Sequence, residues 1–434
     1  MMKGSVLRLN QLVKALFACL LIGILVISPT ADAAKRKNSA STKKSTSSRA
    51  VPKKKTAPAP APEKKETTEE KAVSSLFDGV ASSICIEADT GLVLSEYNAD
   101  EQRPAASMVK MMLFLLVSEG LQDGRWALET PITVTEHAQS MGGSQVQLKA
   151  GEVFTLDQLM HAVAVASAND AATAVAEGLW GSTEEYLLQS NKRAQELGMI
   201  DSHFRSVNGL PPSAGQLPDQ TTARDIVILA QWCVRHPRVM EWAGTKELAF
   251  RPGEHAKSNT NQLLSMVPGC DGLKTGFTRA AGWCVTATAA RDGVRLLTVV
   301  MGGVSSSGRF RVAANNLEYG FASVRKVRLI AKGDPIEVET HVKNCETTSV
   351  RLTASDDLWA IIKADDIDKL ALNPQVPDYI QAPVQAGTSI GEVRAELPGK
   401  ILASVPLTVP QELAEAGWRW KLKNSVLRGV GKGS

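Results

Sequence analysis

The sequence lacks the residue spacings of a metal site. Its six histidines are scattered, with no HExxH or similar pattern, and its six cysteines include no CxxC. Metal sites in proteins usually take several such ligands at short, regular spacing. The sequence therefore indicates no metal site, and we expect the protein to use no cofactor.

Cysteine usage gives no disulfide framework either. Cys19 belongs to an apolar N-terminal stretch, and five cysteines follow it: Cys85, Cys233, Cys270, Cys284 and Cys345. An odd number in an exported protein leaves at least one thiol unpaired. Cysteines between apolar neighbours, such as Cys85 in SSICIEA, fit buried strand positions.

The N-terminal apolar run is too short for an ordinary membrane span. ALFACLLIGILVIS (15–28) is 14 residues long, whereas a span needs about 20. Three basic residues precede it, and the A-x-A sequence Ala31-Asp32-Ala33 follows it. This order is typical of a cleaved export signal. We therefore expect residues 1–33 to be a signal peptide and the mature protein to be exported, to the periplasm or the outer face of the cytoplasmic membrane. An uncleaved anchor is the alternative.

Positive charge is confined to the N-terminal side of the chain. Residues 34–72 hold twelve Lys or Arg against four Glu, and residues 1–33 add a net +2, so the total of +4 leaves −6 for the remaining 362 residues. Such a body is not typical of nucleic-acid-binding proteins, and we expect no nucleic-acid partner. The Lys/Ser/Pro/Ala-rich segment 34–75 has few apolar residues to bury and should be a disordered tether. It is either a solvated spacer or an arm held near anionic polymers.

Residues 76–322 show the strand and helix patterns of an α+β domain, an antiparallel sheet flanked by helices. The apolar run 107–121 predicts a buried helix, and 156–180 predicts two helices with a break around Ser167–Asp170. Other helices are expected at 222–234 and 309–321. Strands are expected at SSICIEA, LVLSEY, DGLKTGF, WCVTATAA and VRLLTVVMGG, the last two joined by an Asp-Gly turn.

The texture changes after this domain. Residues 323–410 contain short strand-like runs with turn residues between them, which predicts a smaller all-β domain. The tail 411–434 is basic and carries Trp418 and Trp420. It could form an amphipathic helix at a membrane surface, but its apolar residues do not share one face and its glycines disfavour a helix. A frayed basic tail is the alternative.

Ser107 and Lys110 stand at the start of the apolar run PAASMVKMMLFLLV (104–117). Residues three apart share a helix face, so the hydroxyl and the amine can meet. Burial and the positive end of the helix dipole both disfavour an ammonium, so Lys110 can be neutral and act as a base for Ser107. The backbone N–H of Ser107 could help to stabilise an oxyanion. A serine N-cap with a lysine that reaches solvent is the alternative.

Two further elements follow in order along the chain. Ser167-Ala168-Asn169 lies at the expected helix break, where a helix N-cap is the alternative. Lys274-Thr275-Gly276 lies in an expected strand, where the glycine would let a substrate backbone approach closely and the polar side chains suit a carboxylate. Each pattern alone is weak, because similar matches occur at Ser41/Lys44, Ser323/Lys326 and Ser206/Asn208.

Together, in this order on helix, loop and strand, the motifs resemble those of the serine penicillin-recognising enzymes. The surrounding stretches resemble the low-molecular-mass penicillin-binding proteins that are D-alanyl-D-alanine carboxypeptidases of peptidase family S11, with the penicillin-binding/β-lactamase-like transpeptidase fold. The resemblance covers about residues 76–322 and continues into 327–409. It rests on ICIEADTGLVLSEYNADEQRPAASMVKMM, GGSQVQLKAGEVFTLDQLMHAVAVASANDAATAVAE and DGLKTGFTRAAGWCVTATAARDGVRLLTVVMGG.

The resemblance implies a reaction and roles in it. The substrate would be a peptidoglycan stem peptide ending in acyl-D-Ala-D-Ala, and β-lactams would acylate the same serine. Ser107 would be the nucleophile and Lys110 its base. Ser167 would relay a proton to the departing D-alanine, Asn169 would hold the substrate peptide, and Lys274 would complete the proton network.

It also implies how the substrate is held. Thr275 would bind the terminal carboxylate, and Arg309, in MGGVSSSGRF, stands where the family has an arginine that faces the same carboxylate. The oxyanion hole would use the backbone N–H groups of Ser107 and Phe277, beside Gly276. Phe277 departs from the His or Tyr that is common there, which could shift substrate preference.

Three rival functions remain open at this point. A class A β-lactamase would need an E-x-x-L-N element, and the nearest match, at residues 185–189, ends in Gln and follows the S-x-N motif too soon. A DD-endopeptidase that cuts cross-links shares the chemistry, although the domain at 327–409 argues mildly against it. A wall-binding protein without activity is the third rival. Residues 203–211, HFRSVNGLP, only approximate the family's H-F-x-N-x-x-G-L stretch, so the loop there is not specified.

Overall fold

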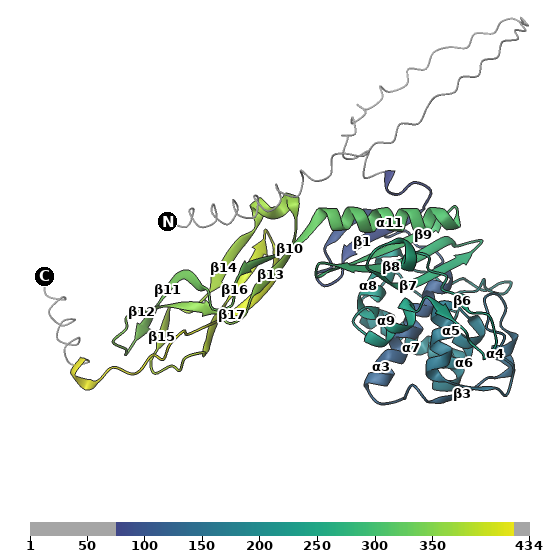
Figure 1. The fold of residues 1–434 in the computed structure, drawn as a ribbon, viewed down its shortest axis with the longest axis horizontal. Coiled ribbons are helices and arrows are strands. Elements are labelled where there is room, and N and C mark those ends of the chain that lie inside the picture. Colours follow the sequence, from purple (N-terminus) through teal and green to yellow (C-terminus); the bar gives the residue numbers. More distant parts are fainter. Residues whose placement is uncertain (1–74, 421–434) are drawn as a thin grey trace, which may run out of the picture. The chain divides into compact units, whose positions relative to one another are not determined.

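The computed structural model describes residues 75–420 (Figure 1). The expected export signal, the expected tether up to residue 74, and residues 421–434 of the expected tail lie outside the described residues. Within the described part, no helix is both long and apolar enough to cross a membrane.

A five-stranded antiparallel sheet organises the first part of the described chain. Its strand order is β2-β1-β9-β8-β7, which pairs the N-terminal hairpin with a strand about 200 residues later and leaves β7 at an edge. All five predicted strands are confirmed. They are β1 (Ser82–Glu87), β2 (Val93–Tyr97), β7 (Cys270–Thr278), β8 (Gly282–Arg291) and β9 (Val294–Gly303). The Asp292-Gly293 turn joins β8 to β9, and both of its residues have positive φ, the geometry that a tight hairpin requires.

Helices cover both faces of this sheet. In Figure 1, α11 (Ser306–Ser323) lies along one face, while α8 (Ala223–Cys233) and α9 (Pro237–Gly244) lie on the other. Successive side chains of β1 enter different cores: Ile84 joins the larger cluster, which contains helices α3 and α8, and Cys85 joins the smaller one with α11. Because both faces are covered, all six residues of SSICIE are buried and the burial does not alternate along the strand.

The remaining elements of this part are the buried helix α3 (Lys110–Gln122) and several further helices and short strands. These are α4 (Glu136–Ser140), α5 (Leu156–Val165), α6 (Asn169–Trp180), α7 (Thr183–Glu196), α10 (Leu263–Met266), β3 (Pro131–Thr133), β4 (Val153–Thr155), β5 (Glu247–Leu248) and β6 (Lys257–Ser258). The predicted break between helices at 156–180 is confirmed, and it falls at residues 166–168.

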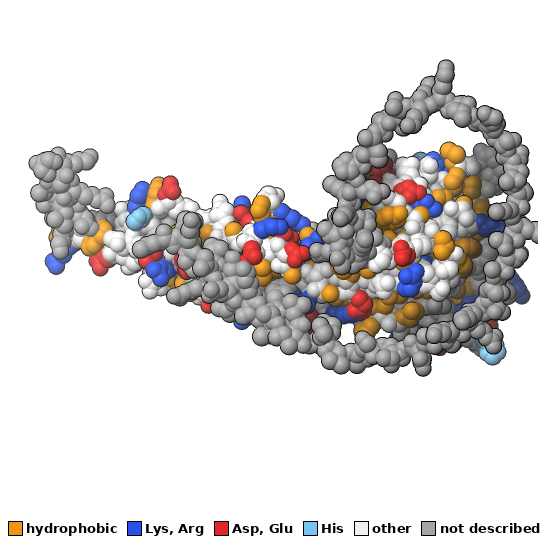
Figure 2. Space-filling model, turned by 90° about the horizontal axis from the view of Figure 1, so that it is seen from above, with side chains coloured by type: hydrophobic (Ala, Val, Ile, Leu, Met, Phe, Trp, Pro, Cys, Tyr) orange, Lys and Arg blue, Asp and Glu red, His pale blue; other side chains and the backbone are white. Residues whose placement is uncertain are grey.

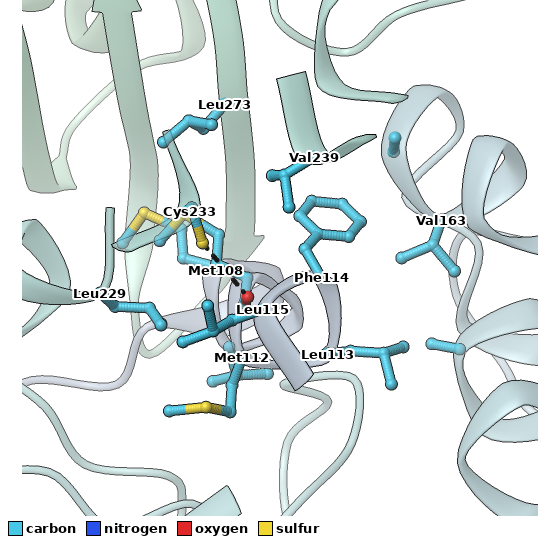
Figure 3. Close-up of a cluster of buried hydrophobic side chains, with 14 of the residues drawn as sticks. Met108, Met112, Leu113, Phe114, Leu115, Val163, Leu229, Cys233, Val239 and Leu273 are labelled. Atoms are coloured by element: carbon cyan, nitrogen blue, oxygen red, sulfur yellow. Dashed lines mark hydrogen bonds between the residues drawn. The ribbon is translucent and has the colours of Figure 1, made fainter. Parts of the chain in front are cut away.

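The buried helix predicted for 107–121 begins differently from the expectation. Residues Ala106–Val109 form a 3₁₀ turn, η1, and the α-helix α3 begins at Lys110. Figure 3 shows side chains of α3, among them Phe114, packed against Val163 and Val239 from neighbouring segments. Ser107 therefore lies on a 3₁₀ turn that precedes the helix, with Ala106 at positive φ before it.

The C-terminal part is built of strands. Strands β10 and β13 pair to form a small two-stranded sheet. The other six strands form a larger sheet in the order β14-β16-β17-β12-β11-β15, in which β15 is parallel to β11. β14 and β15 were not predicted, because one contains Asn and Pro and the other has three residues. The elements are β10 (Val324–Ile330), β11 (Pro335–Lys343), β12 (Ser349–Ala354), β13 (Leu358–Lys363), η2 (Ala364–Lys369), β14 (Ala371–Gln375), β15 (Tyr379–Gln381), β16 (Ser389–Leu397) and β17 (Lys400–Thr408).

The chain stays with this part beyond its last strand. Leu413 is buried and exchanges two backbone hydrogen bonds with Val384, and the N–H of Ala416 donates to the Asn344 carbonyl. Trp418, in the expected tail, is 71% exposed.

On the face drawn in Figure 2, basic and acidic side chains are interspersed. The five cysteines of the described residues are all free thiols.

Candidate active site

Ser107 and Lys110 meet as their spacing predicts. Lys110 Nζ lies 2.9 Å from Ser107 Oγ, and it also donates to Asn169 Oδ1 at 2.6 Å and to the Asn208 carbonyl at 3.0 Å. Ser107 Oγ can donate to the same Asn208 carbonyl, 3.2 Å away. The amine is thus surrounded by one hydroxyl and two carbonyl-type oxygens.

Lys110 is fully buried, so the alternative of a lysine that reaches solvent is excluded. Burial lowers its pKa well below the ordinary lysine value, the charge of Lys274 lowers the pKa further, and Asp170 opposes both. Asp170 is itself buried, where its carboxylate accepts hydrogen bonds from the backbone N–H groups of Val146 and Leu148. An ammonium in this setting loses its proton at a lower pH than an exposed lysine does.

The Ser167-Ala168-Asn169 segment does not cap a helix with its side chains. Ala168 occupies the N-cap position of α6 without a side-chain bond, and Ser167 has a φ of +58°. The Ser167 hydroxyl accepts a hydrogen bond from Lys274, and Asn169 bridges Lys110 and the Gly142 carbonyl, to which its Nδ2 donates at 2.6 Å. The tight break between α5 and α6 therefore turns both side chains toward the two lysines.

Lys274 forms a second buried lysine–serine pair. Its Nζ donates to Ser167 Oγ at 2.8 Å and to the Thr275 carbonyl at 2.9 Å. Burial, aided by the charge of Arg309, lowers the pKa of Lys274 from 10.5 to about 7. Thr275 Oγ1 donates to Thr260 Oγ1 at 2.8 Å. An amine that titrates near neutrality can both accept and return a proton at Ser167.

Gly276 makes a close backbone contact that the sequence did not indicate. A Cβ on this residue would lie 2.8 Å from the Ala105 carbonyl oxygen and 3.1 Å from the backbone nitrogen of Ser107. The glycine thus lets β7 pack directly against the turn that carries Ser107, and close approach of a substrate backbone stays a prediction. This contact ties the Lys274 strand to the Ser107 turn.

Arg309 and Phe277 flank the same end of β7. Arg309 is 5% exposed, and its Nη1 donates to the carbonyls of Gly276 and Cys284, both at 3.0 Å. Burial lowers its pKa to about 10. Phe277 is 48% exposed and stacks on Trp283 with ring centroids 4.0 Å apart. Arg309 therefore links β7 to β8, and Phe277 presents an apolar surface to solvent.

Asn208 is the contact that sequence reasoning missed. Its SVN triplet was treated as a chance repeat of the S-x-N motif, yet its carbonyl contacts both Ser107 and Lys110. A backbone carbonyl leaves no side-chain signal, and the loose family match at 203–211 was the only trace in the sequence. The other chance matches lie elsewhere: Ser323 donates to the Tyr319 carbonyl on its own helix, and Glu185 accepts from Gln189 on α7.

The arrangement can move protons between an alcohol and an amine at two adjoining places. Ser107 with Lys110 and Ser167 with Lys274 are joined through the Ser167–Asn169 break, and β7 stands beside them. Within residues 75–420 no three His, Cys, Asp or Glu side chains gather as a metal site. A partly exposed hydroxyl, that of Ser107, beside a buried amine of lowered pKa is an arrangement suited to nucleophilic catalysis.

Comparisons with known proteins agree with this chemistry. The D-alanyl-D-alanine carboxypeptidase family matches residues 68–305, and the C-terminal domain of penicillin-binding protein 5 matches residues 325–415. The chain is 32% identical over 360 residues to D-alanyl-D-alanine carboxypeptidase DacF of Bacillus subtilis, which covers 82% of this chain and 91% of that protein.

Solved structures agree as well. Penicillin-binding protein 5 of Haemophilus influenzae is 27% identical with a TM-score of 0.62, over 78% of this chain and 98% of that one. Penicillin-binding protein D2 of Listeria monocytogenes, solved with ampicillin bound, is 27% identical with a TM-score of 0.51, over 56% of this chain and 97% of that one. The expected transpeptidase fold is thereby confirmed, and the chain belongs to the D-alanyl-D-alanine carboxypeptidases, a family of serine peptidases that are penicillin-binding proteins.

Proposed function

We propose that Ser107 is the nucleophile of this carboxypeptidase and Lys110 its general base. The observation that carries the assignment is the 2.9 Å contact between Ser107 Oγ and the buried Lys110 Nζ. Neutral Lys110 takes the hydroxyl proton as the oxygen attacks the penultimate carbonyl of acyl-D-Ala-D-Ala. A tetrahedral oxyanion forms, and its collapse breaks the peptide bond and leaves an acyl ester on Ser107.

The leaving D-alanine needs a proton at its nitrogen. Ser167 gives its hydroxyl proton to that nitrogen and regains one from Lys274, whose pKa of about 7 suits transfer in either direction. Water then attacks the ester: Ser167 takes a proton from the water and passes its own to Lys274, and Lys110 returns its proton to the Ser107 oxygen as the acid leaves. Asn169 holds the stem peptide and, through Oδ1, the amine of Lys110.

β7 provides the binding edge. Among residues 75–420 it has no strand partner on its outer side, so an extended peptide can pair with its backbone. Thr275 binds the terminal carboxylate, with the positive charge of Arg309 behind the strand. The backbone N–H groups of Ser107 and Phe277 hold the oxyanion, because Gly276 keeps the two segments in contact.

The test is covalent labelling by a fluorescent penicillin together with D-alanine release from a pentapeptide. Ser107→Ala should abolish both, whereas Ser323→Ala, the matched serine of a chance S-x-x-K pattern, should keep both. Labelling of Ser107→Ala at the wild-type rate would refute the nucleophile assignment. An unlabelled wild type would instead favour a wall-binding protein.

Cleavage of cross-links and hydrolysis of penicillin are not favoured. D-alanine release from the pentapeptide should greatly exceed cleavage of a cross-linked muropeptide dimer by the same sample. Penicillin should remain bound as a slowly hydrolysed ester, because the glutamate of the E-x-x-L-N-like stretch, Glu185, faces its own helix neighbour Gln189. Rapid penicillin turnover would contradict this.

The substrate places the enzyme outside the cytoplasmic membrane. We propose that residues 1–33 direct export, that the protein works in the periplasm or on the outer membrane face, and that the 411–434 tail touches the membrane surface. The exposed Trp418 supports the last point. Flotation of full-length protein with anionic vesicles, compared with a chain ending at residue 417, tests it: equal flotation would contradict it.

A further inference from the structure

The Asn208 carbonyl decides which part of the Lys110 amine faces Ser107. A neutral amine has two N–H bonds and one lone pair. Asn169 Oδ1 at 2.6 Å and the Asn208 carbonyl at 3.0 Å accept the two N–H bonds, which leaves the lone pair for the Ser107 hydroxyl at 2.9 Å. Without the carbonyl, an N–H bond could turn toward Ser107 and the base would be misoriented.

A buried carboxylate holds the turn that carries this carbonyl. Asp219 is 5% exposed. Its Oδ1 accepts from the backbone N–H groups of Arg205 at 2.5 Å and Ser206 at 2.9 Å, and its Oδ2 accepts from Ser206 Oγ at 2.5 Å. Ser206 Oγ in turn accepts from the Gly209 N–H at 2.8 Å. Residues 205–209 are therefore closed around Asn208 by one continuous set of hydrogen bonds.

The turn also packs on the backbone before the nucleophile. Gly209 has a φ of +76°, and a Cβ there would lie 2.1 Å from the Ala106 carbonyl oxygen. A shift of the 205–209 turn would thus move both the carbonyl on Lys110 and the segment that leads into Ser107. Small displacements of this kind are costly, because about 1 Å of misplacement can lower a rate by about 10²-fold.

We infer that Asp219 is a positioning residue for the reaction: through Ser206 it fixes the 205–209 turn so that the Asn208 carbonyl aims the Lys110 lone pair at Ser107. This inference rests on the roles proposed above for Ser107 and Lys110. Asp219 touches neither of them, and the charged or titratable groups near it are Arg205 and Tyr186. A carboxylate suits the place because it only accepts hydrogen bonds, and three donors converge on it.

Glu87 offers a matched control. It is equally buried, and its carboxylate likewise accepts two backbone N–H groups, those of Asp89 and Thr90, and one hydroxyl, that of Thr90. It closes the turn between β1 and β2, and none of these partners belongs to the site. Glu87→Gln should therefore reproduce the structural cost of losing a buried turn anchor without the effect on Lys110.

The experiment compares full-length Asp219→Asn, Ser206→Ala and Glu87→Gln with the wild type. Asp219→Asn replaces an acceptor by a donor toward Ser206 Oγ, and Ser206→Ala removes the link. Each should lower the penicillin acylation rate about 10- to 100-fold and kcat more than KM. The acid limb of the pH–rate profile should also move to lower pH, because a lost acceptor stabilises the protonated amine less. Ser206→Thr, which keeps the hydroxyl, should recover most of the rate.

Each variant is assayed at the same number of degrees below its own Tm. The inference is overturned if the Asp219 and Ser206 variants then react with penicillin as fast as Glu87→Gln and their pH–rate profiles match that of the wild type. If Asp219→Asn does not fold, Ser206→Ala and Ser206→Thr carry the comparison. The double variant should be little worse than either single one, because both act through one link. Failure of the proposed function looks different, since Ser107→Ala would then still be labelled.

Discussion

The two parts of the described chain differ in whether they bury charged side chains. Residues 75–323 bury seven charged side chains: Glu87, Lys110, Asp170, Asp219, Asp225, Lys274 and Arg309. Among residues 324–420 the only buried polar side chain is that of Thr340. The ion pairs of this second part all keep contact with solvent, and in Arg351–Glu339 both side chains are more than half exposed.

This difference separates stability from chemistry. Removing a charge from water costs several kcal/mol unless hydrogen bonds and partners compensate, so a fold that needs only stability keeps charges outside. The first part accepts the cost at Lys110 and Lys274, and the result is two amines of lowered pKa beside two serines. The second part is held by sheet pairing and apolar packing, and its charges should be dispensable.

The sharpest way to break this comparison is to remove the buried amine. Lys110→Met should lower acylation by about 10²- to 10⁴-fold, because the general base is lost. Its Tm should stay the same or rise, because an apolar chain of similar length replaces a buried polar amine. Lys332→Met, at an exposed lysine of the second part, should change neither quantity. A large loss of Tm with retained acylation would make Lys110 a structural residue.

A pair of glycines sharpens the comparison. Gly276→Ala would place a Cβ 2.8 Å from the Ala105 carbonyl oxygen, and Gly391→Ala would place one 2.3 Å from the Gln375 carbonyl oxygen. Both should destabilise the fold, but only Gly276→Ala should lower acylation of the folded enzyme, by about 10- to 100-fold, because it moves β7 away from Ser107. Equal acylation per folded molecule in the two variants would contradict the role of this contact.

Sequence reasoning predicted the five strands of the main sheet and the helix break, because strand and helix periodicity and turn residues record local backbone preferences. It also predicted that Ser107 would meet Lys110, because three residues' separation fixes that geometry. The contact of Lys274 with Ser167 had to come from the family resemblance, since 107 positions separate the two residues.

What the sequence could not give depends on backbone atoms and on shape. The Asn208 carbonyl belongs to any residue type, so no side chain marked it. The contact of Gly276 with the Ser107 turn was not predicted, because a sequence does not show which backbone lies beside a glycine. β14 was not predicted because its Asn and Pro disfavour a strand, and β15 because three residues are too few to show a pattern. Pairing with neighbouring strands forms both.

A smaller effect is expected on the way folding stability changes with pH, and it follows from the pKa of Lys274. Its pKa is about 7 in the folded state against an ordinary 10.5. Below about pH 7 the Lys274 amine holds its proton in both the folded and the unfolded chain. The folded state then bears the full free-energy cost of burying the ammonium. Between that pH and the ordinary lysine pKa only the unfolded chain holds the proton, so rising pH favours folding.

Lys274→Met removes this dependence. Its Tm, relative to the wild type, should therefore be highest near pH 6 and fall by about 5 °C or more toward pH 10. Differential scanning calorimetry across that range measures the trend, and Lys332→Met serves as the flat reference. A Tm difference for Lys274→Met that does not change with pH would mean that Lys274 is charged in the folded protein at all these pH values.

The smallest effect is expected where the second part carries its charge in solvent. Arg351 and Glu339 lie 3.3 Å apart with side chains 59% and 54% exposed. Exposed pairs of this kind contribute about 0–1 kcal/mol to stability, because water and salt screen them. Arg351→Ala should therefore leave the unfolding free energy within about 1 kcal/mol of the wild type and leave acylation unchanged. Urea denaturation measures the first and penicillin labelling the second. A loss of acylation in Arg351→Ala would show that the β-rich part acts on the site after all, and the separation of stability from chemistry would then fail at its most dispensable charge.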